Sequence, residues 1–130
     1  MAKIISFLKF IFHTSVILLI AISLFPGSLI GMILFGDLGR QPNLIHNPFG
    51  TAINHFICYL YISLLGFFLY LRHDNFQKLI LGLLILSVIL ELFHFIIPNR
   101  SFQFVDLFGN ILGVVVALCC VKIYLFYNKS

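Results

Sequence analysis

Four long apolar runs constrain this chain more than any other feature of its sequence. They cover residues 4–25, 53–71, 76–97 and 104–127. At about 1.5 Å of rise per residue, a helix of roughly 20 residues crosses the hydrocarbon core of a bilayer. Lipid admits only helices and closed barrels, and the runs lack the alternating pattern of barrel strands. We therefore predict an all-α, polytopic membrane protein in which residues 1–130 form one domain with four transmembrane helices.

The composition agrees with a chain surrounded by lipid. Apolar residues make up 62% of the sequence and charged residues 9%, and the mean hydropathy is +1.13. Soluble proteins carry about 25% charged residues. The net charge of +4 comes from eight Lys and Arg residues near the ends of the runs, without the basic block typical of a nucleic-acid surface. We expect membrane lipid, and no nucleic acid, as a partner.

Cysteine spacing and a single Glu-x-x-His motif both argue against a metal or a cofactor. Cys58, Cys119 and Cys120 fall inside apolar runs and form neither CxxC nor CxxCH, so we interpret them as small buried hydrophobic residues. Glu91 and His94 have the spacing found in di-iron bundles, which need that motif twice plus two further glutamates. Because Glu91 is the only glutamate in the chain, we predict no metal and no cofactor.

The first apolar run could be a transmembrane helix or a cleaved signal peptide. Lys3 and Lys9 precede its apolar centre, and Ala21-Ile22-Ser23 is an acceptable cleavage site. The run is long for a signal peptide, and cleavage would leave three spans. We therefore expect an uncleaved helix, which Pro26-Gly27 ends.

The connections between the runs differ in length and character. Residues 29–35 are apolar but too short to cross, so we expect them at the interface or re-entering the membrane. Residues 36–50 form the longest polar stretch and are rich in Gly, Pro and Asn, as functional or mobile loops often are. The other two connections, 72–75 and 98–103, are tight.

The Lys and Arg residues are divided unequally between the two sides of the predicted bundle. Arg40 and Arg100 belong to one side, and six residues belong to the other, namely Lys3, Lys9, Arg72, Lys78, Lys122 and Lys129. Cytoplasmic loops of membrane proteins carry the excess of Lys and Arg. We therefore predict a multi-pass protein of the cell inner (cytoplasmic) membrane with both termini in the cytoplasm. Loops 36–50 and 98–103 would then face outward.

Polar residues gather near the outer ends of the last three predicted helices. Glu91 and His94 share one helical face, Asp106 and Asn110 share another, and His55 lies at the outer end of the second run. A charged side chain at the membrane centre costs roughly 2.5 to 3.5 kcal/mol, so these residues cannot face lipid. We predict that the three helices bring them together in one cluster.

The glutamate of this cluster must be neutral, paired or placed in a wet cavity. Candidate partners for Glu91 are Arg100, folding back over the helix end, and a protonated His55 or His94. Two explanations stay open for the cluster. It could lock the helices in register, or it could form a functional site, which is the usual expectation for ionisable residues inside a membrane.

Two glycines predict where helices approach each other closely. Gly109 and Gly113 form a GxxxG motif in the last run, and this motif permits close helix–helix packing. Since Gly113 continues the helical face of Asp106 and Asn110, the packing face and the polar face are neighbours.

The order of these residues resembles the VanZ-like family of bacterial membrane proteins. The resemblance covers about residues 54–117 and rests on His55-Phe56, Glu91, Pro98, Arg100, Asp106, Asn110 and Gly113. The family pattern has a Gln where this chain has His94, and a Lys shortly before the position of His55 that this chain lacks. The resemblance implies a four-helix membrane protein without an agreed activity, named after a member linked to resistance to a glycopeptide antibiotic.

Two functional hypotheses follow. In the first, an outer-leaflet site built from His55, Arg100, Asp106 and Asn110 binds or processes a cell-envelope lipid, an anionic head group or a lipid-linked precursor. Arg100 would hold the anion, Asp106 and Asn110 would orient the cation, and Glu91 or His94 would handle a proton as the candidate catalytic residue. In the second, the chain is a small accessory or assembly subunit of a larger membrane complex. Its 16 phenylalanines would then contact other subunits, and the polar cluster would be structural. Whether the chain is an enzyme stays open.

Overall fold

The computed structural model describes residues 2–40 and 50–128, and all regular elements in this part of the chain are helices. The five helices are α1 (Ala2–Leu24), α2 (Leu29–Phe35), α3 (Ala52–Tyr70), α4 (Phe76–Phe93) and α5 (Phe104–Tyr127). Within these described residues, α1, α3, α4 and α5 are long and apolar enough to span a membrane. The predicted all-α, multi-pass architecture is therefore confirmed. Most of the predicted 36–50 loop, residues 41–49, lies outside the described residues.

One predicted helix end is wrong by a full turn. The third long helix was expected to cover residues 76–97, but α4 ends at Phe93. The backbone then tightens, because the N–H groups of Phe95 and Ile96 donate to carbonyls three residues earlier. Pro98 contributes to the early end, because it has no N–H to donate to the His94 carbonyl and its ring would clash with that carbonyl in a continuing helix. The other long helices begin and end within about two residues of their predicted bounds.

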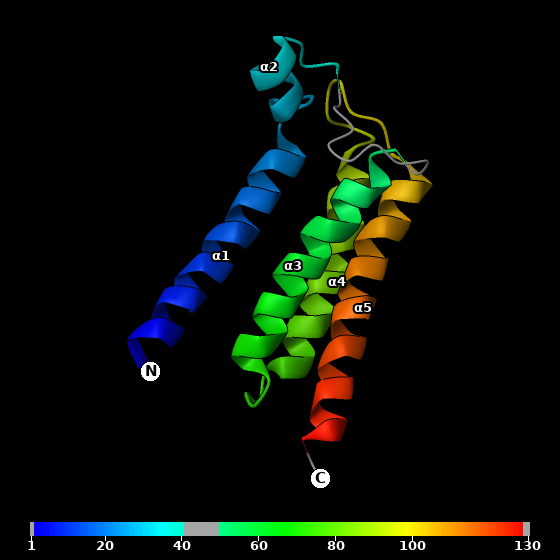
Figure 1. The fold of residues 1–130 in the computed structure, drawn as a ribbon. Coiled ribbons are helices and arrows are strands. Elements are labelled where there is room, and N and C mark those ends of the chain that lie inside the picture. The colour runs from blue at the N-terminus through cyan, green and yellow to red at the C-terminus, as the bar shows by residue number, and fades with distance from the viewer. Residues whose placement is uncertain (1, 41–49, 129–130) are drawn as a thin grey trace.

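The short apolar segment after α1 forms a capped helix, α2, of about two turns. Ser28 Oγ accepts a hydrogen bond from the Gly31 N–H at 2.9 Å at the start of α2. Gly36 ends α2 in the left-handed conformation, with φ at 68°. The chain then returns, and the Ser28 N–H donates to the Leu38 carbonyl at 2.7 Å. In Figure 1, α2 lies beyond the end of α1, to one side of the other helices.

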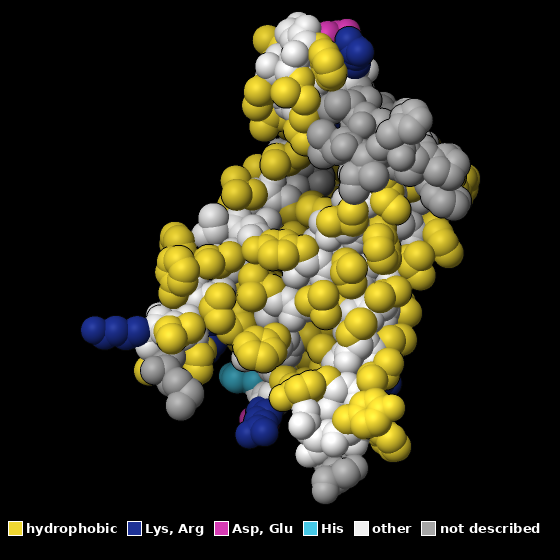
Figure 2. Space-filling model, viewed as in Figure 1, with side chains coloured by type: hydrophobic (Ala, Val, Ile, Leu, Met, Phe, Trp, Pro, Cys, Tyr) yellow, Lys and Arg dark blue, Asp and Glu magenta, His cyan; other side chains and the backbone are white. Residues whose placement is uncertain are grey.

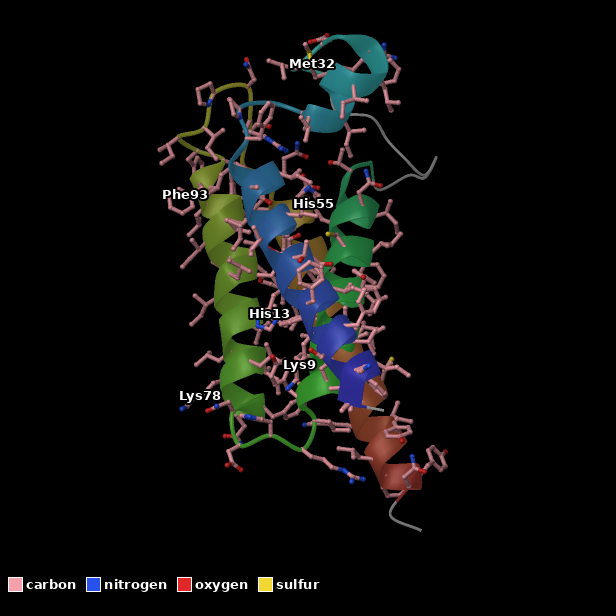
Figure 3. All side chains as sticks on the ribbon, turned by 90° about the vertical axis from the view of Figure 1, so that its left-hand side faces the viewer. Lys9, His13, Met32, His55, Lys78 and Phe93 are labelled. Atoms are coloured by element: carbon pink, nitrogen blue, oxygen red, sulfur yellow. The ribbon has the colours of Figure 1, made fainter. Side chains whose placement is uncertain are left out.

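Helices α3, α4 and α5 form a compact bundle, and α1 crosses its outer face (Figures 1 and 3). The core contains the buried residues Tyr59, Ile62, Phe67, Leu83, Val114, Ala117 and Val121. Within α1, all of which the structure describes, Phe12 is the one buried residue. Its ring lies against Gly66 of α3, where an added Cβ would be 2.6 Å from Phe12 Cε2. The absence of a side chain at Gly66 thus leaves room for Phe12, the only buried side chain of α1.

The outer surface of the helices is apolar, and charged residues lie at the two ends (Figure 2). Many large hydrophobic side chains are exposed, as expected for a surface that faces acyl chains. Lys9 and Lys78 lie at the same end of the bundle, and His55 lies near the opposite end (Figure 3). The expectation of buried cysteines is wrong for Cys119 and Cys120, which are exposed on α5. A thiol is apolar enough to face lipid, so the apolar run required no burial within the protein.

Candidate functional site

Two glycines place α3 and α5 in close contact beside the polar cluster. An added Cβ at Gly109 would be 2.6 Å from the Ala52 carbonyl oxygen, and one at Gly113 would be 2.7 Å from the Phe56 carbonyl oxygen. Both obstacles are backbone atoms of α3, so no side-chain rotation could relieve the contact. Because the backbones are this close, short polar side chains can reach from one helix to the other.

Asp106, in the first turn of α5, contacts Thr51, which directly precedes α3, and His55 of α3. The hydroxyl of Thr51 donates to the carboxylate, with distances of 3.1 Å and 3.3 Å to its two oxygens. The Nε2 atom of His55 lies 3.6 Å from Asp106 Oδ2. Asp106 is buried, so these contacts compensate for the loss of water around its charge.

Asn110, one turn further along α5, joins three helices. Its amide oxygen lies 3.0 Å from His55 Nδ1, and its amide nitrogen donates to the Ser87 carbonyl of α4 at 3.4 Å. Both ring nitrogens of His55 thus face oxygen atoms, one of Asn110 and one of Asp106. Because the amide oxygen of Asn110 can only accept, Nδ1 is the donor in the shorter contact, whereas the 3.6 Å contact with Asp106 is too long for a hydrogen bond.

Glu91 and His94 form a second group at the end of α4. Glu91 Oε1 accepts a hydrogen bond from the backbone N–H of Gln103 at 3.1 Å and lies 3.2 Å from His94 Nδ1. Both side chains are buried, at 1% and 5% exposure. Two donors converge on one carboxylate oxygen, which suits an ionised carboxylate. The structure therefore places Glu91 in contact with His94, one of its predicted candidate partners.

Arg100 does not fold back over Glu91, and its side chain contacts the end of α1 instead. Its Nη2 donates to the Ile22 carbonyl at 2.9 Å, and its Nε lies 3.5 Å from the Phe25 carbonyl. These carbonyls belong to the C-terminal end of α1, where helical carbonyls lack partners within the helix. Burial lowers the pKa of the Arg100 guanidinium, while the carboxylates of Glu91 and Asp106 act in the opposite direction. Arg100 therefore joins α1 to the site, and within the described residues it forms no ion pair with Glu91.

Four buried polar atoms of the described chain have no hydrogen-bond partner. They are the Tyr59 hydroxyl, Ser63 Oγ, Glu91 Oε2 and His94 Nε2. Leaving a buried polar group unsatisfied costs about 1 to 3 kcal/mol. Such atoms are therefore uncommon in folded proteins, and they mark places where a ligand or water can bind.

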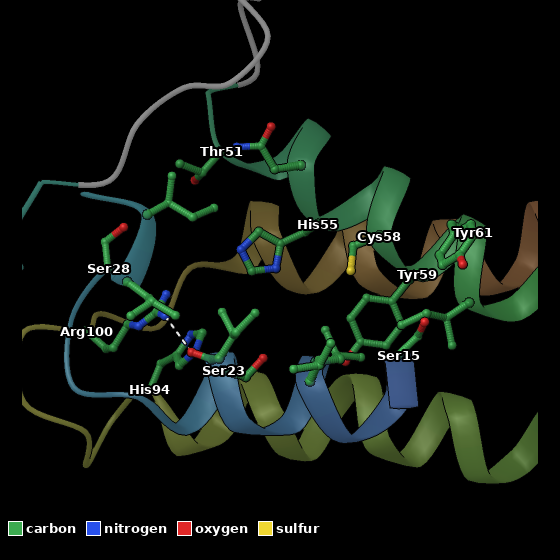
Figure 4. Close-up of a pocket in the computed structure, with 17 residues that line it drawn as sticks. Ser15, Ser23, Ser28, Thr51, His55, Cys58, Tyr59, Tyr61, His94 and Arg100 are labelled. Carbon is green, nitrogen blue, oxygen red and sulfur yellow. Dashed lines mark hydrogen bonds between the residues drawn. The ribbon is translucent and has the colours of Figure 1, made fainter. Parts of the chain in front are cut away.

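A cavity of about 400 Å³ lies between α1 and α3 next to these groups (Figure 4). His55, His94 and Arg100 line the end of the cavity that lies nearest the α4–α5 connection. Much of the remaining wall is apolar and includes Leu18, Leu19, Ile22, Leu29, Ile30 and Ile62. Serine, threonine and tyrosine hydroxyls add further polar atoms, as Figure 4 shows for Ser15, Ser23 and Thr51. Since Leu18 and Tyr61 are half exposed and also line the cavity, it opens sideways on the surface of the spans.

The structure thus brings all the predicted site residues to one end of the bundle, in two groups. One consists of His55, Asp106 and Asn110, and the other of Glu91 and His94, with Arg100 beside the cavity. Sequence reasoning missed Thr51, Ser87 and Gln103. Thr51 precedes His55 by one turn, so helical spacing could have suggested it. Gln103 and Ser87 contribute backbone atoms, for which the sequence carries no signal.

The fold and site define a helical, multi-pass membrane protein with a polar, laterally open cavity near one end. No protein-family model, curated protein or solved structure matches the chain. The VanZ-like assignment therefore stays a prediction based on the residues quoted above. Among the described residues, no group of three or more His, Cys, Asp or Glu side chains is arranged to hold a metal ion.

Proposed function

We propose that this chain is a VanZ-like protein of the bacterial inner membrane that binds an anionic cell-envelope lipid or lipid-linked precursor. The lining of the cavity between α1 and α3 carries the proposal. Its described residues include Arg100, His55 and His94 but no Asp or Glu. A guanidinium and histidines suit a phosphate group, and the apolar wall suits an acyl chain. One anionic amphiphile would match both parts of the cavity.

The carboxylates support this binding role from behind the cavity. Asp106 and Asn110 hold His55 from the α5 side, and Glu91 contacts His94. The carboxylates thereby orient the two histidine rings, while Asp106 and Glu91 themselves lie outside the cavity lining. Glu91 and His94 remain the candidates for proton handling, and the proposal itself concerns binding.

Lipid binding tests the proposal directly. The full chain, purified in mild detergent, would be titrated with dioctanoyl phosphatidylglycerol and dioctanoyl phosphatidylcholine, with bound lipid counted by native mass spectrometry. We expect the anionic lipid to bind at least about tenfold more tightly, since a hydrogen bond to a charged group contributes about 1.5 to 3 kcal/mol. Arg100→Gln should remove most of this preference. The matched control is Arg40→Gln, which changes the other outer-end arginine, stacked on Phe35 away from the cavity lining.

Two results would contradict the lipid-binding proposal. One is equal binding of both lipids with no effect of Arg100→Gln. The other is copurification at fixed stoichiometry with a larger assembly that covers the cavity. The second result would favour an accessory subunit in which the polar cluster only joins helices.

The proposed orientation places both termini in the cytoplasm and the cavity in the outer leaflet. It is supported by the six-to-two division of Lys and Arg between the two ends of the bundle. The N-terminal end of α1, the α3–α4 connection and the C-terminal end of α5 all lie at one end (Figure 1). The α4–α5 connection lies at the other end.

Cysteine labelling tests this orientation. In a background where Cys58, Cys119 and Cys120 are replaced by serine, Ser101→Cys should react with a membrane-impermeant maleimide added to intact cells. Asn75→Cys should react only after the membrane is opened. Both positions are exposed, so burial does not complicate the comparison. Labelling of Asn75→Cys but not Ser101→Cys in intact cells would invert the topology and place the cavity in the inner leaflet.

A further inference from the structure

The unpartnered nitrogen of His94 has a defined hydrogen-bonding character. Glu91 Oε1 lies 3.2 Å from His94 Nδ1, and an ionised carboxylate can only accept hydrogen bonds. The ring hydrogen must therefore sit on Nδ1 to donate to Glu91. In the neutral ring, Nε2 then carries a lone pair and acts as an acceptor.

This acceptor is buried, and its residue is one of those that line the cavity. His94 is 5% exposed and lines the cavity, and its Nε2 has no hydrogen-bond partner among the described residues. Figure 4 shows the rings of His94 and His55 and the guanidinium of Arg100 around the same end of the cavity. A bound molecule that satisfies Nε2 must bring a hydrogen-bond donor close to the anion held by Arg100.

We propose that the ligand's head group carries a free hydroxyl next to its phosphate, and that His94 Nε2 accepts a hydrogen bond from this hydroxyl. The inference rests on the proposed function and names its substrate class. An ammonium group is also a donor, but the charged lining of the described cavity is cationic and would repel it. The selected class is therefore a phosphodiester lipid with a polyol head group.

The role of Glu91 in this recognition is indirect. It holds the ring hydrogen on Nδ1 and so keeps Nε2 available as an acceptor, as carboxylates do for histidines in many sites. Glu91 is thus a positioning residue, and His94 makes the contact. The other titratable groups that line the cavity are His55, Cys58, Tyr59 and Tyr61 from α3 and Arg100 from the α4–α5 connection, and Asp106 of α5 lies behind His55.

A pair of matched lipids tests this inference. The full chain in detergent would be titrated with dioctanoyl phosphatidylglycerol and with dioctanoyl phosphatidylpropanol, which has the same charge and carbon count but no head-group hydroxyl. We expect phosphatidylglycerol to bind about tenfold more tightly, the effect of one hydrogen bond to an otherwise unsatisfied buried acceptor. Equal affinity, or tighter binding of phosphatidylpropanol, would overturn the inference without any variant being needed.

Two substitutions assign the preference to His94. His94→Leu should bind both lipids with the affinity of phosphatidylpropanol. His94→Gln should keep the preference, because its amide can donate to Glu91 and still present an oxygen to the ligand. A preference that survives in His94→Leu would overturn the inference. If neither anionic lipid binds the parent protein more tightly than phosphatidylcholine does, the proposed function fails as well, so the two failures are distinguishable.

Discussion

Replacing Gly113 by alanine should destabilise the protein by about 3 kcal/mol, at the upper end of the usual range for overpacking. The new Cβ would be 2.7 Å from the Phe56 carbonyl oxygen, 2.8 Å from the Leu60 nitrogen and 3.0 Å from Tyr59 Cβ. Two of these atoms are α3 backbone, so α3 and α5 must separate. Separation would also lengthen the His55–Asn110 contact. A thermal melt in detergent should show a large fall in the transition temperature.

Gly82 supplies a matched control for this substitution. It lies in the interior of α4, and an added Cβ would meet no atom within 4 Å. Gly82→Ala should leave the transition temperature unchanged or raise it slightly, because alanine favours helix by up to about 1 kcal/mol. If the two alanine variants melt at the same temperature, the close α3–α5 contact is not a determinant of stability.

Replacing Glu91 by leucine should also cost about 3 kcal/mol, whereas glutamine should be well tolerated. Leucine removes the acceptor for the Gln103 N–H and for His94 Nδ1, and each unsatisfied buried group costs about 1 to 3 kcal/mol. Glutamine keeps an oxygen that can accept both bonds. We therefore expect Glu91→Gln to melt near the parental temperature and Glu91→Leu to melt far below it. Melts of both variants, run beside the lipid titration, check this directly.

The double variant Glu91→Gln, Arg100→Gln separates this explanation from a buried ion pair. If Glu91 and Arg100 were paired, Glu91→Gln alone would be strongly destabilising and the second change would restore stability. The contacts of Arg100 with the Ile22 and Phe25 carbonyls predict the opposite. Arg100→Gln should loosen the end of α1 whichever residue occupies position 91. Restoration of stability in the double variant would refute this assignment.

The membrane-spanning helices were predictable because length and hydropathy are local properties. Even so, α4 ends one turn before its predicted end, because Pro98 cannot donate to the His94 carbonyl and disfavours a continuing helix. Helical spacing also predicted that Asp106 and Asn110 share a face, and the GxxxG motif indicated the side of α5 that α3 approaches. These inferences needed only distances along one helix.

The partners across helices were harder to predict from the sequence. Arg100 has a long side chain that can reach several acceptors, and its actual acceptors are backbone carbonyls of α1. Every residue has a backbone carbonyl, so the sequence does not indicate which one an arginine contacts. Residue types alone therefore favour a carboxylate as the partner of Arg100. The cavity could not be predicted from the sequence either, because its size depends on the distance between α1 and α3. Phe12 is the only buried residue of α1, so the rest of α1 leaves space beside α3.

For the lipid ligand that we propose, the sideways opening of the cavity beside Leu18 and Tyr61 changes which concentration governs binding. A lipid that enters there arrives by two-dimensional diffusion within one leaflet and never crosses the aqueous phase. Occupancy is then set by the mole fraction of that lipid among its neighbours, whatever the volume of the surrounding water. Competition comes from the bulk lipids of the same leaflet, so selectivity between head groups matters more than absolute affinity.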